Sequence, residues 1–200
     1  MPPLRFLDIR WSTQDPDALV ARLRASGFTV ESGRVIAFPS ATIGIDAGTA
    51  ATDRLEIAEG SSLPGSPPGP HPNGVEDVLA IGWATVDRER FVSGLGLGTV
   101  EQLPDDPHLG AYVVRHGLTR PATLVIEPST EGRLSATLAR SGEGPTALYL
   151  ELGTDGVKAF AADHRPGAVQ VSTVRPGPLG PSVVLLGGRI WDPVVVLVAR

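Results

Sequence analysis

Residue types that bind metals lie next to one another in the run Asp105-Asp106-Pro107-His108. Two carboxylates and an imidazole could together bind a divalent cation. The same run also has the composition of a turn, because an Asp side chain bonds the backbone two residues on and Pro restricts the chain direction. We therefore expect a solvated turn here rather than a metal site.

The other histidines show no pattern that favours catalysis. His71 lies in a Pro-rich stretch, His116 ends a strand-like run, and His164 lies near a helix end, where a cation suits the helix dipole. The run Gly94–Gly98 lacks the Lys-Ser/Thr of a phosphate-binding loop and is expected to be a helix end and a turn. No Ser/His/Asp triad can be inferred without geometry.

The composition excludes several classes of function. The chain has 200 residues, 42% of them hydrophobic, with a formal net charge of −5 and a pI of about 5.3. It has no cysteine, which excludes disulfide and thiol chemistry, and no basic stripe for nucleic acid. Its longest apolar runs, near 183–186 and 194–198, are far shorter than the about 20 residues of a membrane span, and no leader is visible. We expect a cytoplasmic protein with no nucleic-acid or membrane partner.

The elements that must position the candidate residues begin with a βαβββ unit in residues 1–60. An alternation of apolar and polar residues predicts the first strand, and Asp15 followed by Pro16 is typical of a helix start. Short runs rich in β-formers, with turn residues between them, follow the helix. The expected strands lie at 4–11, 28–31, 34–38 and 42–46, with a spare strand at 54–58.

A linker and a repeat of the same unit follow. Residues 61–76 carry a run of Pro, Gly and Ser that cannot form a helix or a ladder, and we expect an extended, fairly stiff segment. Residues 9–15 then align with residues 81–87, because the Ile, the Trp, the Thr and the helix-capping Asp all coincide. The second unit is predicted to occupy residues 77–128.

A third unit follows a pattern of strand, helix, turn and strand between residues 123 and 152. Pro128 ends the first strand, because proline cannot donate to a ladder. The helix expected over 130–141 ends at Gly142, which can take a positive φ. The third unit covers 144–200, with strands expected at 146–152, 168–174, 182–186 and 194–198.

The junction between the second and third units resembles that of one protein superfamily. A strand ending in Glu127-Pro128, a short helix and then Gly142-Glu143-Gly144 is similar to the module junction of methylmalonyl-CoA epimerases. These belong to the vicinal-oxygen-chelate superfamily, with glyoxalase I, extradiol dioxygenases and bleomycin-resistance proteins. The resemblance implies an α+β fold of repeated βαβββ modules that form glyoxalase-like open barrels, with three modules in this chain. Residues 77–200 would be the complete two-module domain, and residues 1–60 an extra module.

Active members of this superfamily hold a divalent metal in the cup, the inner face of the paired modules. Each module supplies a His from its first strand and a Glu or Gln from its last strand. The matching positions here are Ala80, Thr146 or Ala147, Leu124, and Val195 or Val196. None is a useful metal ligand. We therefore expect no metal site in 77–200 and no cofactor, with a divalent metal as the alternative.

The extra module differs, because the same positions in it hold Asp8 and Glu56. Both are possible metal ligands, and a homodimer that paired two such modules would bring four carboxylates together. We expect instead that Asp8 and Glu56 form ion pairs with Arg10 or Arg54 across strands, and the metal site is the alternative. A lone module also exposes a sheet edge, which is a second reason to expect a twofold dimer.

Strand alternation predicts which other residues face the cup of the two-module domain. These candidate ligand-binding residues are Ala80, Gly82, Ala147, Tyr149 and Glu151. The small residues leave volume, and a Tyr and a carboxylate beside apolar walls suit a small organic molecule with one polar end. The alternative is that Tyr149 fills the cup and Glu151 reaches solvent at its mouth.

Three functions fit these observations. The first is a metal-free, glyoxalase-like protein that sequesters or senses a small organic molecule, as bleomycin-resistance proteins do. The second is a metal-dependent lyase, isomerase or dioxygenase whose site is built across a dimer from Asp8 and Glu56. The third is a structural or interaction module whose cup is filled by side chains. The first, which is not an enzyme, accounts best for intact modules that lack metal ligands.

Overall fold

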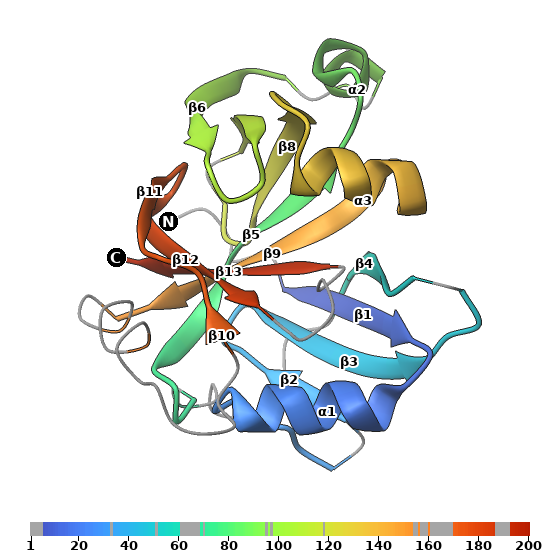
Figure 1. Cartoon of the computed structure of the whole chain (residues 1–200), viewed down its shortest axis with the longest axis vertical. Helices are drawn as coiled ribbons and strands as arrows, with labels where there is room; N and C mark the ends of the chain where they lie inside the picture. The colour runs from blue at the N-terminus through green and yellow to red at the C-terminus, as the bar shows by residue number, and fades with distance from the viewer. Residues whose placement is uncertain are drawn as a thin grey trace.

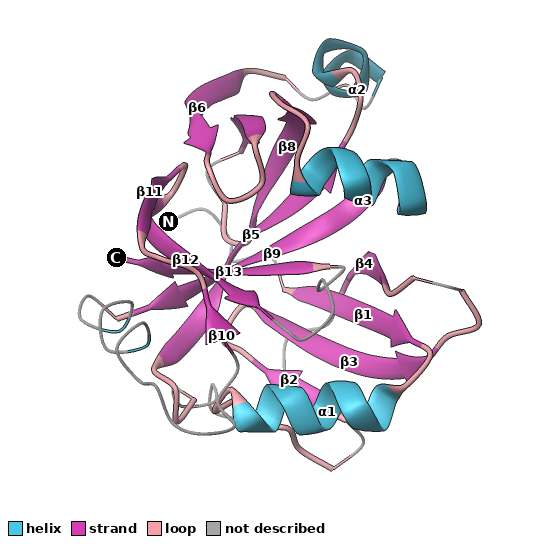
Figure 2. Cartoon of the chain, viewed as in Figure 1, coloured by secondary structure: helices cyan, strands magenta, loops and turns pink. Residues whose placement is uncertain are grey.

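The computed structural model describes residues 6–32, 34–50, 52–60, 69, 71–94, 96, 98–117, 119–153, 156, 160, 170–186 and 193–200. In this part of the chain the strands form a four-stranded sheet from residues 7–59 and a nine-stranded sheet from residues 75–199 (Figure 1). Figure 2 shows that strands dominate and helices are few. The α+β class expected from the sequence is confirmed. No described helix is long and apolar enough to cross a membrane.

The large sheet contains the second and third units. The second unit consists of β5 (Val75–Ala84), α2 (Arg88–Gly94), β6 (Val100–Asp106), β7 (Ala111–His116) and β8 (Ala122–Pro128). The helix α3 (Arg133–Ser141) then leads to β9 (Gly144–Leu152), β10 (Gln170–Val171), β11 (Arg175–Gly177), β12 (Gly180–Leu186) and β13 (Val194–Ala199). In both units the last strand lies parallel to the first, β8 beside β5 and β13 beside β9. This agrees with the βαβββ pattern, although the helix expected in the third unit lies mostly outside the described residues, as do His164 and most of the linker.

The two units are joined through their first strands. β5 and β9 run antiparallel, with Ala80 opposite Tyr149 and Gly82 opposite Ala147. The strand order of the continuous sheet is β10-β12-β13-β9-β5-β8-β7-β6, and β11 pairs with β12. β6 and β11, from opposite ends of this order, contact each other without pairing in the described chain. The sheet therefore curves around an interior and stays an open barrel.

The small sheet departs from the expected order. Its elements are β1 (Leu7–Thr13), α1 (Pro16–Ala25), β2 (Val35–Ala37), β3 (Ala41–Ala47) and β4 (Arg54–Glu59). The strand order is β2-β3-β1-β4, with β3 parallel to β1 and β4 antiparallel on its other side. The spare strand β4 therefore lies beside β1 in the way that β9 lies beside β5. In Figure 1 the blue elements β1 and α1 lie together in the lower part of the view.

The strand expected at 28–31 is wrong. Phe28 and Val30 are buried, but the backbone makes only isolated hydrogen bonds, some of them to side chains, and forms no ladder with a neighbouring strand. The Thr29 N–H donates to His71 Nδ1 at 3.1 Å, and the Val30 carbonyl accepts from Arg24 Nη2 at 3.2 Å. His71 lies in the expected linker, so the segment is a loop held partly by a residue 42 positions away along the chain.

The internal repeat is confirmed at the level of local structure. Asp15 Oδ1 accepts the Ala18 N–H at 2.9 Å at the start of α1, and Asp87 Oδ1 accepts the Arg90 N–H at 2.9 Å at the start of α2. Each carboxylate satisfies a backbone donor that has no partner within the helix. The helix α3 begins three residues later than expected, at Arg133, with Gly132 as an N-cap that makes no side-chain bond.

Two apolar clusters lie on the two faces of the large sheet. One contains the buried side chains of the small sheet and α1, such as Ile9 and Leu19, together with Ile81 and Leu148 of the large sheet. The other fills the inside of the large sheet, the cup. Its buried members are Leu79, Ala80, Ala84, Leu109, Ala111, Val113, Ala122, Leu124, Ile126, Leu134, Ala147, Tyr149, Val184, Val194, Val196 and Val198.

Candidate functional site

The structure brings together four of the five residues predicted to face the cup. Ala80 and Gly82 on β5 lie beside Ala147 and Tyr149 on β9, and Ala80, Ala147 and Tyr149 are 0% exposed. A Cβ added at Gly82 would lie 3.0 Å from Ala147 Cβ and 3.2 Å from Tyr149 Cε2. The centre of the cup is therefore packed, and Tyr149 occupies the space that the small residues leave.

The positions that match the superfamily's metal ligands lie in the same packed cluster. Ala80, Leu124, Ala147 and Val196 are all 0% exposed, whereas the alternative position Val195 belongs to the cluster on the other face. Hydrocarbon side chains have no lone pair to give to a cation. Among the residues that the structure describes, no group of three or more His, Asp or Glu could hold a metal ion. The donor set of this cup does not fit a divalent metal.

A carboxylate that the sequence placed in a solvated turn, Asp106, is buried and closes the cup. The Tyr149 hydroxyl donates to Asp106 Oδ2 at 2.8 Å, and Asp106 Oδ1 accepts the backbone N–H groups of His108 and Leu109 at 2.8 and 3.1 Å. Burial, with the nearby charge of Asp106, raises the pKa of Tyr149 well above its ordinary value. Residues 105–108 do form the end of a strand and a turn, but the expected solvation is wrong for Asp106, which is 1% exposed.

The turn after Asp106 is tied to the other end of the sheet. His108 Nε2 donates to the Ser182 carbonyl at 3.0 Å, and Arg175 Nη1 donates to the Pro107 carbonyl at 3.3 Å. Burial lowers the pKa of His108 below its ordinary value, which favours the neutral imidazole. The turn therefore spans the gap between β6–β7 and β11–β12. The one local signal for it was Leu109, an apolar residue directly after the polar run, which is 1% exposed.

One end of the cup opens into a small cavity of about 170 Å³. Its floor is apolar, because Leu79 and Ala122 belong to the cup cluster and Leu179 packs against it. Its remaining walls come from the loop between β7 and β8 and from three arginines: Arg115, Arg120 and Arg200. We call this cavity the cup mouth. It combines a hydrocarbon floor with guanidinium groups.

Glu151, the fifth predicted residue, lies beside the cup mouth as an ion-pair partner. Its Oε2 lies 2.7 Å from Arg120 Nη1, and only 14% of the Glu151 side chain is exposed. Arg115 pairs with Glu101. The Arg115 Nε is nevertheless buried without a hydrogen-bond partner. A buried donor without an acceptor costs free energy, so the position of Arg115 beside the cavity carries a local cost in stability.

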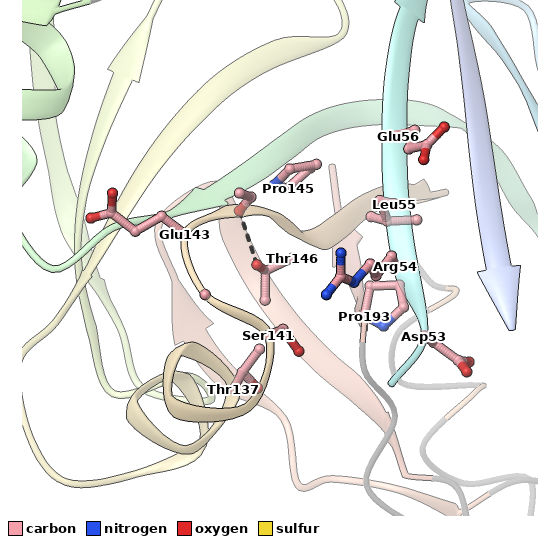
Figure 3. A pocket seen from close by; sticks show the side chains of 12 residues that line it. Asp53, Arg54, Leu55, Glu56, Thr137, Ser141, Glu143, Pro145, Thr146 and Pro193 are labelled. Carbon is pink, nitrogen blue, oxygen red and sulfur yellow. Dashed lines mark hydrogen bonds between the residues drawn. The ribbon is translucent and has the colours of Figure 1, made fainter. Parts of the chain in front are cut away.

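Among the described residues, neither Asp8 nor Glu56 belongs to a cluster of side chains that could hold a metal ion. Asp8 Oδ1 accepts the Thr42 hydroxyl at 2.7 Å, and neither carboxylate forms the expected ion pair. Arg10 instead pairs with Asp46 at 3.1 Å. Glu56 lies on the wall of a second cavity, and Figure 3 shows its side chain directed away from that cavity.

The carboxylate of the Gly-Glu-Gly motif has a structural role. Glu143 Oε1 accepts the Thr85 hydroxyl at 2.7 Å and the Val86 N–H at 3.0 Å, and Arg90 Nη2 lies 2.7 Å from it. These hydrogen bonds, first from Thr85 and then from Arg90 and Val86, lower the pKa of Glu143 to about 2. Glu143, directly before β9, thus holds the turn between β5 and α2 in place.

Comparisons with known proteins support the fold. No family model and no curated protein sequence matches the chain. Among solved structures, methylmalonyl-CoA epimerase from Mycobacterium tuberculosis is similar, with 18% identity, 64% of this chain and 89% of that chain covered, and a TM-score of 0.52. The Streptomyces coelicolor methylmalonyl-CoA epimerase has 23% identity, covers 63% of this chain and 95% of that chain, and has a TM-score of 0.47. The likeness to the Mycobacterium tuberculosis structure shows that the chain shares its glyoxalase-like fold, as the sequence predicted.

Proposed function

We propose that this protein binds a small organic anion at the cup mouth, without a metal and without chemistry on the bound molecule. The observation that carries the proposal is the composition of the cup mouth, where the apolar side chains of Leu79 and Ala122 lie beside the guanidinium of Arg115. A guanidinium fork matches the geometry of a carboxylate, and charge-assisted bonds of this kind are among the stronger polar contacts. Leu79, Ala122 and Leu179 would contact the hydrocarbon part.

The interior of the cup supports binding rather than catalysis. Asp106 and Tyr149 bond each other and are closed to solvent, so neither is placed to exchange a proton with a molecule in the cavity. The aliphatic residues at the superfamily's metal positions support the same conclusion. The packed centre also favours a second candidate, in which the glyoxalase-like fold acts only as a structural or interaction module.

The test is a titration of the ¹⁵N-labelled full chain with hexanoate, and with hexanamide as the uncharged match. Hexanoate should shift the amide signals of Gly117, Thr119 and Arg120, and hexanamide should not. Arg115→Ala should weaken hexanoate binding by roughly 10- to 100-fold, the equivalent of one charge-assisted hydrogen bond. Arg10→Ala removes one exposed positive charge elsewhere and should leave the affinity unchanged. Absence of hexanoate shifts in this loop would refute the proposal and favour the structural module.

A further inference from the structure

A second cavity, of about 190 Å³, lies between the small sheet and the junction of the second and third units (Figure 3). One wall is the start of β4, residues 53–56. The opposite wall is the end of α3 and residues 142–146, and Pro193 completes the lining. The cavity shares no lining residue with the cup mouth. We call it the junction cavity.

Arg54 is the positive group of the junction cavity. Figure 3 shows its guanidinium extending from β4 into the cavity toward Thr146. Within the described part of the chain, the Arg54 side chain has no ion pair and no hydrogen bond, unlike those of Arg115 and Arg120 at the cup mouth. A guanidinium can donate five hydrogen bonds in a planar fork, so this side chain is an open binding group.

The acidic residues of the lining do not neutralise Arg54. Asp53 Oδ2 accepts the Trp11 indole N–H at 3.1 Å, and Glu143 is held by Arg90 and Thr85. Figure 3 shows the side chains of Asp53, Glu56 and Glu143 all directed away from the cavity. The carboxyl end of α3 also borders the cavity and carries only about half a negative charge, whereas Arg54 carries a full positive charge on a side chain directed into the cavity.

The remaining lining suits the rest of a small molecule. Leu55, Pro145 and Pro193 present hydrocarbon, and the side chain of Leu55 belongs to the core. Ser141 and Thr146 supply hydroxyl groups; Thr146 Oγ1 donates to the Gly144 carbonyl at 2.9 Å and keeps its lone pairs. The cavity thus pairs one guanidinium with polar and apolar walls, which is the usual composition of a small-molecule site.

We propose that the junction cavity binds the oxyanion group, carboxylate or phosphate, of a small molecule, with Arg54 as its counter-ion. The walls belong to the small sheet on one side and to the large-sheet unit on the other. A molecule bound between them contacts both and stabilises their contact, since anything that binds only the native state raises stability. The inference is independent of the cup mouth.

The experiment titrates the ¹⁵N-labelled full chain with benzoate, with inorganic phosphate and with benzamide as the neutral match. Benzoate, phosphate or both should shift the amides of Arg54, Ser141 and Thr146 and raise the thermal midpoint, and benzamide should do neither. A response to benzoate alone identifies a carboxylate site, and a response to phosphate alone identifies a phosphate site. Signals from this set are separate from those of Gly117–Arg120, so this proposal and the cup-mouth proposal succeed or fail separately.

Arg54→Gln is the decisive variant, and Arg10→Gln on the neighbouring strand is its matched control. Arg54→Gln should keep the unfolding midpoint of the free protein, because its side chain has no partner among the described residues, yet weaken anion binding at least about tenfold. Arg10→Gln should bind as the parent does. Equal shifts with benzamide, unchanged affinity in Arg54→Gln, or no shift at Arg54 and Thr146 with either anion would each overturn the inference.

Discussion

The inner face of the large sheet is apolar and buried, whereas the matching face of the small sheet is polar and exposed. The internal repeat aligns Asp8 with Ala80 and Arg10 with Gly82, so these pairs occupy equivalent positions on their first strands. Ala80 is 0% exposed in the cup, while Arg10 is exposed and paired with Asp46. The same kind of unit therefore carries opposite side chains on the same face.

The difference follows from what lies beside the first strand. β5 pairs with β9, which brings a whole second unit to cover its inner face, but β1 pairs with β4, a single strand that leaves this face open to water. Apolar side chains on a covered face stabilise the fold because they are removed from water, and apolar side chains on an open face do not. β4 pairs with the edge of β1 that a three-stranded module would leave free. That edge is therefore no longer a reason to expect a second subunit. The homodimer stays a prediction, which the mass of the native protein can test.

The largest effect is expected from exchanging the two faces. Ala80→Asp would put a charge into the packed cup with no partner, and should lower the free energy of unfolding by about 4–5 kcal/mol. The reverse change, Asp8→Ala on the open face, should cost no more than about 0.5 kcal/mol. Urea unfolding of both variants measures the difference. Similar losses would mean that the two faces are not as different as their burial indicates.

A smaller effect is expected from the bond that closes the cup. Tyr149→Phe removes the hydroxyl that donates to the buried Asp106 and should cost about 2–3 kcal/mol, the range for a hydrogen bond to a charged group. Tyr112 is 43% exposed, so Tyr112→Phe is the matched control and should be nearly neutral. Chemical unfolding compares them. A neutral Tyr149→Phe would show that Asp106 is satisfied by its backbone donors alone.

Two histidines, the buried His71 and the half-buried His108, should make stability depend on pH. Burial lowers the pKa of His71, whose Nδ1 accepts the Thr29 N–H, and burial likewise lowers that of His108. The unfolded chain then binds protons more readily than the native chain, so stability should fall as pH drops below the ordinary value of 6.5. His71→Gln should remove part of this fall and His108→Gln another part. Unfolding measured at pH values above and below 6.5 tests it, and a parent protein whose stability is flat across this window would contradict the assignment.

The smallest expected effect is a loss of stability at the lowest pH, and it comes from Glu143. Its pKa is lowered from 4.5 to about 2, so its contribution to stability is present above 4.5 and should be lost as pH falls toward 2. Glu143→Gln should remove that pH dependence and leave the histidine effect unchanged. Unfolding midpoints between these two values provide the measurement. Glu131→Gln, on the exposed segment before α3, should retain the dependence of the parent.

Much of the fold could be predicted from local sequence. Asp15 and Asp87 were expected to cap helices and do so, because a cap needs only residues within one turn of it. The alternation in β1 and the strand–helix–strand order around Gly142 were also local signals. The resemblance to the superfamily predicted that Ala80, Leu124 and Ala147 share one face, because repeated units put equivalent residues on the same face. The structure places all three in one cluster.

By itself, then, the sequence determined most of the strands and helices, which faces are apolar, and that the superfamily's metal positions in the cup would carry hydrocarbon side chains. Only the tertiary structure decided that Asp106 is buried against Tyr149, that Thr29 bonds to His71, and that β4 joins the free side of β1. Each of these depends on a partner more than 40 residues away along the chain, as the separations of 43 for Asp106–Tyr149 and 42 for Thr29–His71 show. A buried polar group takes whichever partner the packing brings to it, and the packing is set by the whole chain.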